Sequence, residues 1–230
     1  MNTLVVSIVN RSIIKNIPHL DKLEKFFSSI KDVTCMNISM GSKSDVNQEN
    51  TIVGSTGFDK LIAQCRNNKY DLVVVYYNGY GASFQDEVLL GKFKEEIRDD
   101  YDGYITLSIL LENIKDNGKS KSCNASFVLF LECGLIHFKG EMYDNNLCRG
   151  RDNCWIGYVT KFGRAVAAGD SIIENFIKIM STKDFRDLDN LWRKLSLIHN
   201  EKSMYFALLW NMLHGTRDVS EDFNKVFLRK

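Results

Sequence analysis

The chain has little that would interrupt a compact fold: one proline in 230 residues, no internal repeat and no low-complexity tract. That proline, Pro18, falls just before a helical pattern, where proline is tolerated best. Hydrophobic residues make up 44% of the chain, which is enough to build a sizeable core. We therefore expect a single globular domain over residues 1–230.

Net charge and long apolar runs are also missing. The 30 basic and 29 acidic side chains nearly cancel, so no strong field favours nucleic acid or an anionic membrane. No apolar run approaches the length of a membrane span, and residues 1–10 are too poor in basic side chains for a secretory signal. We expect a cytoplasmic protein that binds neither nucleic acid nor membranes.

The six cysteines lack the C-x-x-C pairing that makes zinc sites recognisable. Cys148 and Cys154, with His137 nearby, could be read as metal ligands, but without that pairing we predict no metal and no other cofactor. Because the cysteines are scattered through a chain without an export signal, we expect reduced thiols rather than disulfides.

Four apolar runs show no alternation with polar residues, a pattern typical of strands buried on both faces. They cover residues 4–9, 72–77, 127–131 and 155–159. Apolar residues at three- and four-residue spacing predict helices within residues 20–30, 58–65, 105–114, 171–180 and 185–198. Residues 223–228 alternate apolar and polar side chains like a half-buried strand. Alternating strands and helices predict an α/β fold with a mostly parallel sheet covered on both sides.

Two glycine-containing segments follow the second and third apolar runs, where open α/β sheets gather their functional groups. They are residues 78–83 (Asn-Gly-Tyr-Gly-Ala-Ser) and residues 132–134 (Glu-Cys-Gly). Because glycine accepts tight backbone conformations, we predict two turns that each expose a side chain at the sheet edge. The first segment lacks the third glycine or lysine of a phosphate-binding loop, and Ser83 lacks the G-x-S-x-G elbow of a serine nucleophile.

These segments resemble parts of the caspase family. Residues 69–81 are similar to the caspase and metacaspase strand that ends in a Gly-His-Gly or Ser-His-Gly turn, with Tyr80 in place of the histidine. Residues 127–134 resemble the strand that ends in the nucleophile, which places Cys133 at the catalytic cysteine position. The flanking segments also correspond in order: residues 4–30 to the first strand and helix, 155–180 to the start of the small subunit, and 220–228 to the final strand.

The resemblance implies a caspase-like three-layer sandwich, in which a mostly parallel six-stranded sheet lies between helices and its last strand pairs with a mate in a dimer. It divides the single domain into a large-subunit-like part (1–143), a linker (144–153) and a small-subunit-like part (154–230). It also places Gly81 in a turn on the side where an oxyanion would bind.

The active site that the resemblance implies is not intact. Leu131 and Gly134 replace the glutamine before the nucleophile and the arginine after it, and residues 166–168 (Val-Ala-Ala) occupy the region of the pocket arginine. A cysteine protease also needs a base with a pKa near neutrality to hold its thiolate. The phenol of Tyr80, with an ordinary pKa of about 10, is mostly neutral at pH 7 and cannot supply that cationic partner.

We therefore interpret the sequence as a catalytically inactive caspase homologue. It would regulate an active caspase in apoptosis or immune signalling, either by heterodimerisation or by competing for that caspase's adaptor or inhibitor. It could also form a homodimer.

Two alternatives stay open. One is an active cysteine endopeptidase of altered specificity that uses Cys133 with another base, such as His137. Labelling of Cys133 by a thiol-directed peptide inhibitor would support it. The other is an unrelated α/β hydrolase or nucleotide-processing domain, which would be favoured if the second and third strands were not neighbours. On the plainest interpretation, Cys133 is only a small hydrophobic residue at a strand end.

Overall fold

The computed structural model describes residues 1–10, 18–40, 51–52, 56–84, 87–91, 104–115, 125–136, 153–161, 172–199, 204–210 and 219–228. Its elements follow in the order β1 (Thr3–Asn10), α1 (Pro18–Ser28), β2 (Val33–Met40), β3 (Thr51–Ile52), α2 (Thr56–Asn67), β4 (Leu72–Phe84), β5 (Glu87–Gly91), β6 (Tyr104–Thr106), α3 (Leu107–Lys115), β7 (Ser126–Ile136), β8 (Cys154–Lys161), α4 (Ile173–Thr182), α5 (Leu188–His199), β9 (Met204–Trp210) and α6 (Val219–Phe227).

The strands form one sheet with the order β3-β2-β1-β4-β7-β8-β9. Neighbouring strands from β3 to β8 are parallel, and β9 joins β8 in antiparallel orientation. The predicted α/β fold with a mostly parallel sheet is confirmed. The described sheet has nine strands rather than six, because β3 and the antiparallel extension formed by β5 and β6 add three short strands.

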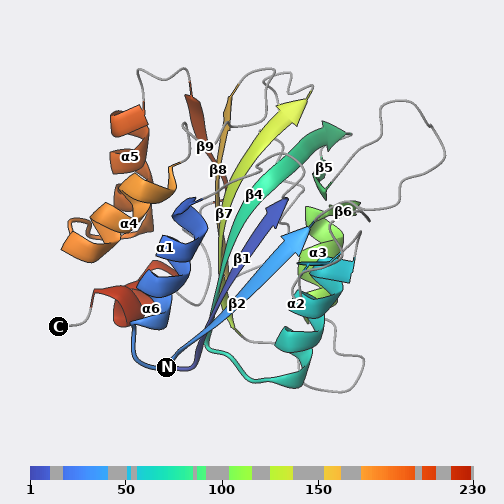
Figure 1. Cartoon of the computed structure of the whole chain (residues 1–230), viewed down its shortest axis with the longest axis horizontal. Coiled ribbons are helices and arrows are strands. Elements are labelled where there is room, and N and C mark those ends of the chain that lie inside the picture. Colours follow the sequence, from blue (N-terminus) through green and yellow to red (C-terminus); the bar gives the residue numbers. More distant parts are fainter. Residues whose placement is uncertain are drawn as a thin grey trace.

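Helices cover both faces of this sheet (Figure 1). One face carries α2 and α3, and the other carries α1, α4, α5 and α6. Val73 and Val75 of β4 belong to the core against α2 and α3, whereas Val74 and Tyr76 belong to the core on the opposite face. Both sets are buried, which explains why the strand sequences show no polar alternation. No helix in the described part of the chain is long and apolar enough to cross a membrane.

Aromatic rings fill the core between the sheet and helices α4, α5 and α6. The ring of Phe130 on β7 lies 5.0 Å from that of Phe176 and 5.3 Å from that of Trp155. Trp155 packs edge-to-face against Trp192 of α5, with ring centroids 5.8 Å apart. Gly157 leaves room for this pair, because a Cβ there would lie 2.5 Å from Trp155 Cη2 and 2.9 Å from Trp192 Cε2. Close packing of the two indoles therefore requires glycine at this position.

The C-terminal region differs from the sequence prediction. Residues 220–228, predicted to match the final caspase strand, lie in and directly after helix α6. Helical spacing brings Val219, Phe223 and Phe227 onto one buried face. A short apolar pattern of this kind, taken alone, fits the period of a helix as well as that of a strand. The edge of the sheet is formed instead by β9, which the sequence patterns did not predict.

Polar contacts fix α6 to its neighbours. Ser126 of β7 donates a hydrogen bond from Oγ to Asp222 Oδ2 at 2.7 Å, and both side chains are buried. The Ser220 hydroxyl oxygen accepts a hydrogen bond from the backbone N–H of Leu188 at 3.0 Å, which satisfies a donor at the start of α5. Helix α6 is therefore an integral part of the core.

Candidate functional site

The two segments that the sequence singled out lie side by side. Strands β4 and β7 are parallel neighbours, paired continuously from Leu72 and Ser126 to Ala82 and Ile136. In this register Gly79 is opposite Cys133. The second and third apolar runs are thus adjacent, and the segments that follow them lie towards the carboxyl ends of the two strands (Figure 1).

The predicted turns are absent at these positions. β4 continues through Tyr80 to Phe84, and β7 continues through Cys133 to Ile136. Gly81, expected in an oxyanion-side turn, is paired with Leu90 on one side and Leu135 on the other. The β5 strand supplies the partner that keeps this end of β4 extended, and a pattern limited to residues 78–83 could not reveal that pairing. Tyr80 occupies the register position opposite Gly134.

Cys133 is buried, with 1% of its surface exposed. It belongs to the core against α2 and α3, together with Leu129 and Leu131 of the same strand. Burial, together with the nearby charge of Glu132, raises the pKa of the Cys133 thiol to about 12. At neutral pH this thiol is protonated, and neither nucleophilic attack nor metal binding is open to it in that state.

Glu132 is the buried acid that sequence reasoning did not single out. It is 1% exposed and accepts hydrogen bonds from the Tyr76 hydroxyl and from the backbone N–H of Ile172, the latter at 3.2 Å. Ile172 is the N-cap residue of α4, where the helix dipole favours a carboxylate. The one signal in the sequence was an acidic residue directly after a fully apolar run. Glu132 therefore ties the end of β7 to β4 and to the start of α4.

Asn78 extends this polar end of the strands. It lies opposite Glu132 in the β4–β7 ladder and is 2% exposed. Its Nδ2 atom has no hydrogen-bond partner in the described part of the structure. The carboxyl ends of the two central strands are thus polar on the face of α4, whereas Cys133 belongs to the apolar core of the other face.

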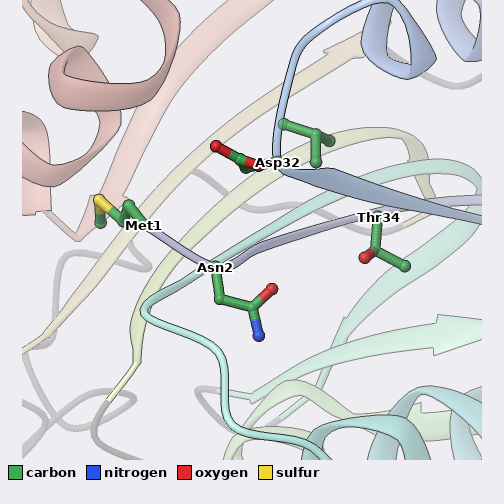
Figure 2. Close-up of a pocket in the computed structure, with 5 residues that line it drawn as sticks. Met1, Asn2, Asp32 and Thr34 are labelled. Atoms are coloured by element: carbon green, nitrogen blue, oxygen red, sulfur yellow. The ribbon is translucent and has the colours of Figure 1, made fainter.

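A pocket lies at the opposite end of the sheet (Figure 2). It is formed by Met1 and Asn2 before β1 and by Asp32, Val33 and Thr34 at the start of β2. These residues are at the amino ends of the parallel strands, whereas Cys133 is close to the carboxyl end of β7. The pocket therefore does not belong to the site around Cys133.

Several residues considered from the sequence cannot be placed. His137, Cys148 and residues 144–152 of the linker lie outside the described residues, as does the 166–168 segment. Cys133 and Cys154 are both buried, each with 1% of its surface exposed. Within the described ranges, no group of three or more histidine, cysteine, aspartate or glutamate side chains is arranged to hold a metal ion.

Comparison with known proteins does not identify a family. No protein-family model matches this chain, and no curated protein matches it. The functional proposal is therefore argued from the residues of this chain.

Proposed function

We propose that this chain is a catalytically inactive caspase homologue that regulates an active caspase in the cytoplasm, in apoptosis or immune signalling. The main observation in support of this proposal is that Cys133 is buried and that its thiol is protonated at neutral pH. The residue at the nucleophile position is 1% exposed, and its thiol has a pKa of about 12. A thiol that is buried and protonated cannot attack a peptide bond at an appreciable rate.

The arrangement of the sheet supports the same proposal. Six neighbouring strands, β2-β1-β4-β7-β8-β9, lie between two layers of helices, and five of them are parallel. A mostly parallel sheet covered by helices on both faces supports the proposal, because the resemblance implies a sheet of that kind. The strands carrying Tyr80 and Cys133 are neighbours, which argues against the unrelated fold in which they would be apart. In the proposal, a caspase-like scaffold whose cysteine is buried and protonated suits a regulator better than an enzyme.

The outer edge of β9 is where we place the contact with a partner. No described strand pairs with β9 on the side away from β8. Its sequence, Met-Tyr-Phe-Ala-Leu-Leu-Trp, has none of the charged residues or prolines that protect edge strands from pairing. A related chain could add its own last strand along this edge by backbone hydrogen bonding.

Two exposed apolar side chains lie on α5, the helix that contacts β9. Leu197 and Ile198, in the last turn of α5, are 65% and 48% exposed, and α5 packs on β9. Large hydrophobic residues that are exposed to solvent are typical of a contact surface. In the proposal, backbone pairing along the edge of β9 orients the partner chain, and Leu197 and Ile198 add apolar surface that the contact buries.

The test is a titration of the purified chain into an active caspase from the same cells, with peptide cleavage as the readout and the chain alone as the blank. We expect a concentration-dependent rise or fall in the rate over a flat blank. The Ile198→Asp variant should abolish the effect. The matched control is Ile109→Asp on α3, because Ile109 has the same 48% exposure but lies on the opposite face of the sheet.

Two results would overturn the proposal. One is a caspase rate that does not change at any concentration of the chain. The other is cleavage by the chain alone that disappears in Cys133→Ala, which would make it an active endopeptidase. An equal loss of effect in the Ile109 and Ile198 variants would reject the placement of the partner at the β9 edge.

A further inference from the structure

The pocket at the amino ends of β1 and β2 adjoins an unpaired stretch of strand. In the described part of the chain, β3 pairs with β2 only at Ser39 and Met40. Residues 33–38 of β2 therefore pair with β1 on one side and with no described strand on the other. The first two of these residues, Val33 and Thr34, also line the pocket (Figure 2). The pocket and the free edge of β2 thus meet at Val33 and Thr34.

The free edge lacks the features that keep edge strands from pairing with other chains. Its sequence, Val-Thr-Cys-Met-Asn-Ile, contains no proline and no charged residue. At about 3.3 Å per residue, residues 33–38 span about 20 Å. Extended peptides bind to edges of this kind through backbone hydrogen bonds. The length and the sequence of this stretch therefore suit the addition of one short strand.

Asp32 supplies a negative charge at the start of this edge. It is exposed, and its carboxylate takes part in no hydrogen bond or ion pair with any described residue, the adjacent Lys31 included. Its backbone carbonyl accepts a hydrogen bond from the N–H of Thr3 at 3.4 Å, which fixes the residue next to β1. A second carboxylate, that of Asp71, lies close by and accepts a hydrogen bond from the backbone N–H of Asn2 at 2.8 Å.

The lining of the pocket suits one basic side chain. The pocket has a volume of about 320 Å³, which is at the lower end of the range for ligand sites. Met1 and Val33 offer apolar atoms for an aliphatic stem, and Asp32 is the one charged side chain among the five that line the pocket. The hydroxyl of Thr34 can accept a further hydrogen bond, and arginine has enough donors to use it together with the carboxylate.

We propose that the edge of β2 is a second docking surface, which binds an extended segment of a partner protein and holds a basic side chain of that segment on Asp32. The backbone of the segment adds a strand along residues 33–38, and its basic residue lies at the end next to Thr34. In the strand order, β2 lies towards one end of the sheet and β9 forms the other. The inference therefore goes beyond the proposed contact with a caspase.

The experiment measures binding of fluorescent peptides to the full chain by anisotropy. The probes are peptides of about seven residues with alternating threonine and valine, acetylated and amidated, in which one arginine takes each position in turn. We expect the tightest binding when the arginine is at one end of the peptide. The same peptide with glutamate in that position should bind at least about tenfold more weakly.

Asp32→Asn removes the charge and keeps the backbone, because asparagine tolerates the left-handed conformation of this residue, whose φ is 63°. This variant should bind the best arginine peptide about three- to tenfold more weakly. The matched control is Asp59→Asn in the first turn of α2, which should bind the peptide like the unmodified chain. Thr34→Lys places a cation beside Asp32 on the free edge and should abolish binding. Circular dichroism of each variant checks that it is folded.

Three results of the peptide titrations would overturn the inference. They are the absence of binding by every arginine peptide up to millimolar concentrations, equal losses in Asp32→Asn and Asp59→Asn, and binding of acetyl-arginine amide as tight as that of the peptide. The last result would show that the pocket takes a cation without an added strand. Sedimentation of the chain alone tests another occupant, because a dimer that Thr34→Lys dissociates would show that a second copy fills the edge. None of these measurements includes a caspase, so failure of the two proposals can be distinguished.

Discussion

Cys133 lies directly opposite Gly79 in the parallel ladder between β4 and β7. Since glycine has no side chain, the residue paired with Cys133 provides no base. The thiol is enclosed by apolar side chains of the core against α2 and α3. The local pairing and the burial thus act together to keep this cysteine inert.

Alkylation should be very slow at Cys133 in the folded chain. With a thiol pKa of about 12, the residue stays protonated at pH 7.5, and its burial blocks access of the reagent. We expect iodoacetamide to modify Cys133 at least about a hundredfold more slowly in the native chain than in urea. Mass spectrometry of tryptic peptides measures both rates, and the half-buried Cys35 provides an internal comparison. Similar native rates at Cys133 and Cys35 would contradict the burial argument.

Replacing Glu132 should loosen α4. In Glu132→Ala, the Tyr76 hydroxyl and the Ile172 N–H lose a buried acceptor, so the free energy of unfolding should fall by about 2–5 kcal/mol. Tyr76→Phe removes one of the two donors and should have a smaller effect. Urea denaturation of both single variants and the double variant measures their coupling. Additive effects of the two substitutions would show that the Tyr76–Glu132 bond is not important for stability.

A methyl group at position 157 should disturb the tryptophan pair. In Gly157→Ala, the new Cβ would lie 2.5 Å from Trp155 Cη2, so the indole or the strand must shift. We expect a loss of about 1–3 kcal/mol in the free energy of unfolding. Near-UV circular dichroism should also change, because the edge-to-face contact of Trp155 and Trp192 is asymmetric. An unchanged spectrum together with unchanged stability would show that these rings do not pack as described.

The helical state of the C-terminal segment can be tested by comparing its two faces. Phe223 and Phe227 are buried against aromatic neighbours, so alanine at either position should lower the free energy of unfolding by about 3–5 kcal/mol. Lys225→Ala should lower the free energy of unfolding much less than either phenylalanine replacement, because its ion pair with Glu221 is at the surface. In a strand, positions 223, 225 and 227 would share one face, and a large effect at Lys225 would support that alternative.

The sequence allowed the central strands to be predicted because burial on both faces leaves a continuous apolar run. β1, β4, β7 and β8 are of this kind, and helices α1, α2, α4 and α5 show clear three- and four-residue spacing. By contrast, β2 contains polar residues at Thr34 and Asn37, which are exposed near the edge of the sheet, so its pattern is weak. β9 is apolar, but no glycine or proline between α5 and β9 marks where the strand begins.

The site was harder to predict than the fold, since its features depend on pairing between distant segments. Residue types alone suggested a turn at Gly81, but its two strand partners come from β5 and β7. The adjacency of the Tyr80 and Cys133 segments could be expected from their motif order. The burial of Cys133 and the bonds of Glu132 could not, because they depend on which face of β7 each residue occupies.

The pairing of β7 with β8 joins the part of the chain before residue 137 to the part after residue 152 through hydrogen bonds, in addition to the chain that connects them. Six residue pairs link the two strands, and α6, from the last part of the chain, is bonded to Ser126 of β7. A protease that cut anywhere between residues 137 and 152 would therefore yield two fragments that migrate separately in denaturing gels but elute together in gel filtration. Separate expression of the two fragments should allow them to reassemble on mixing.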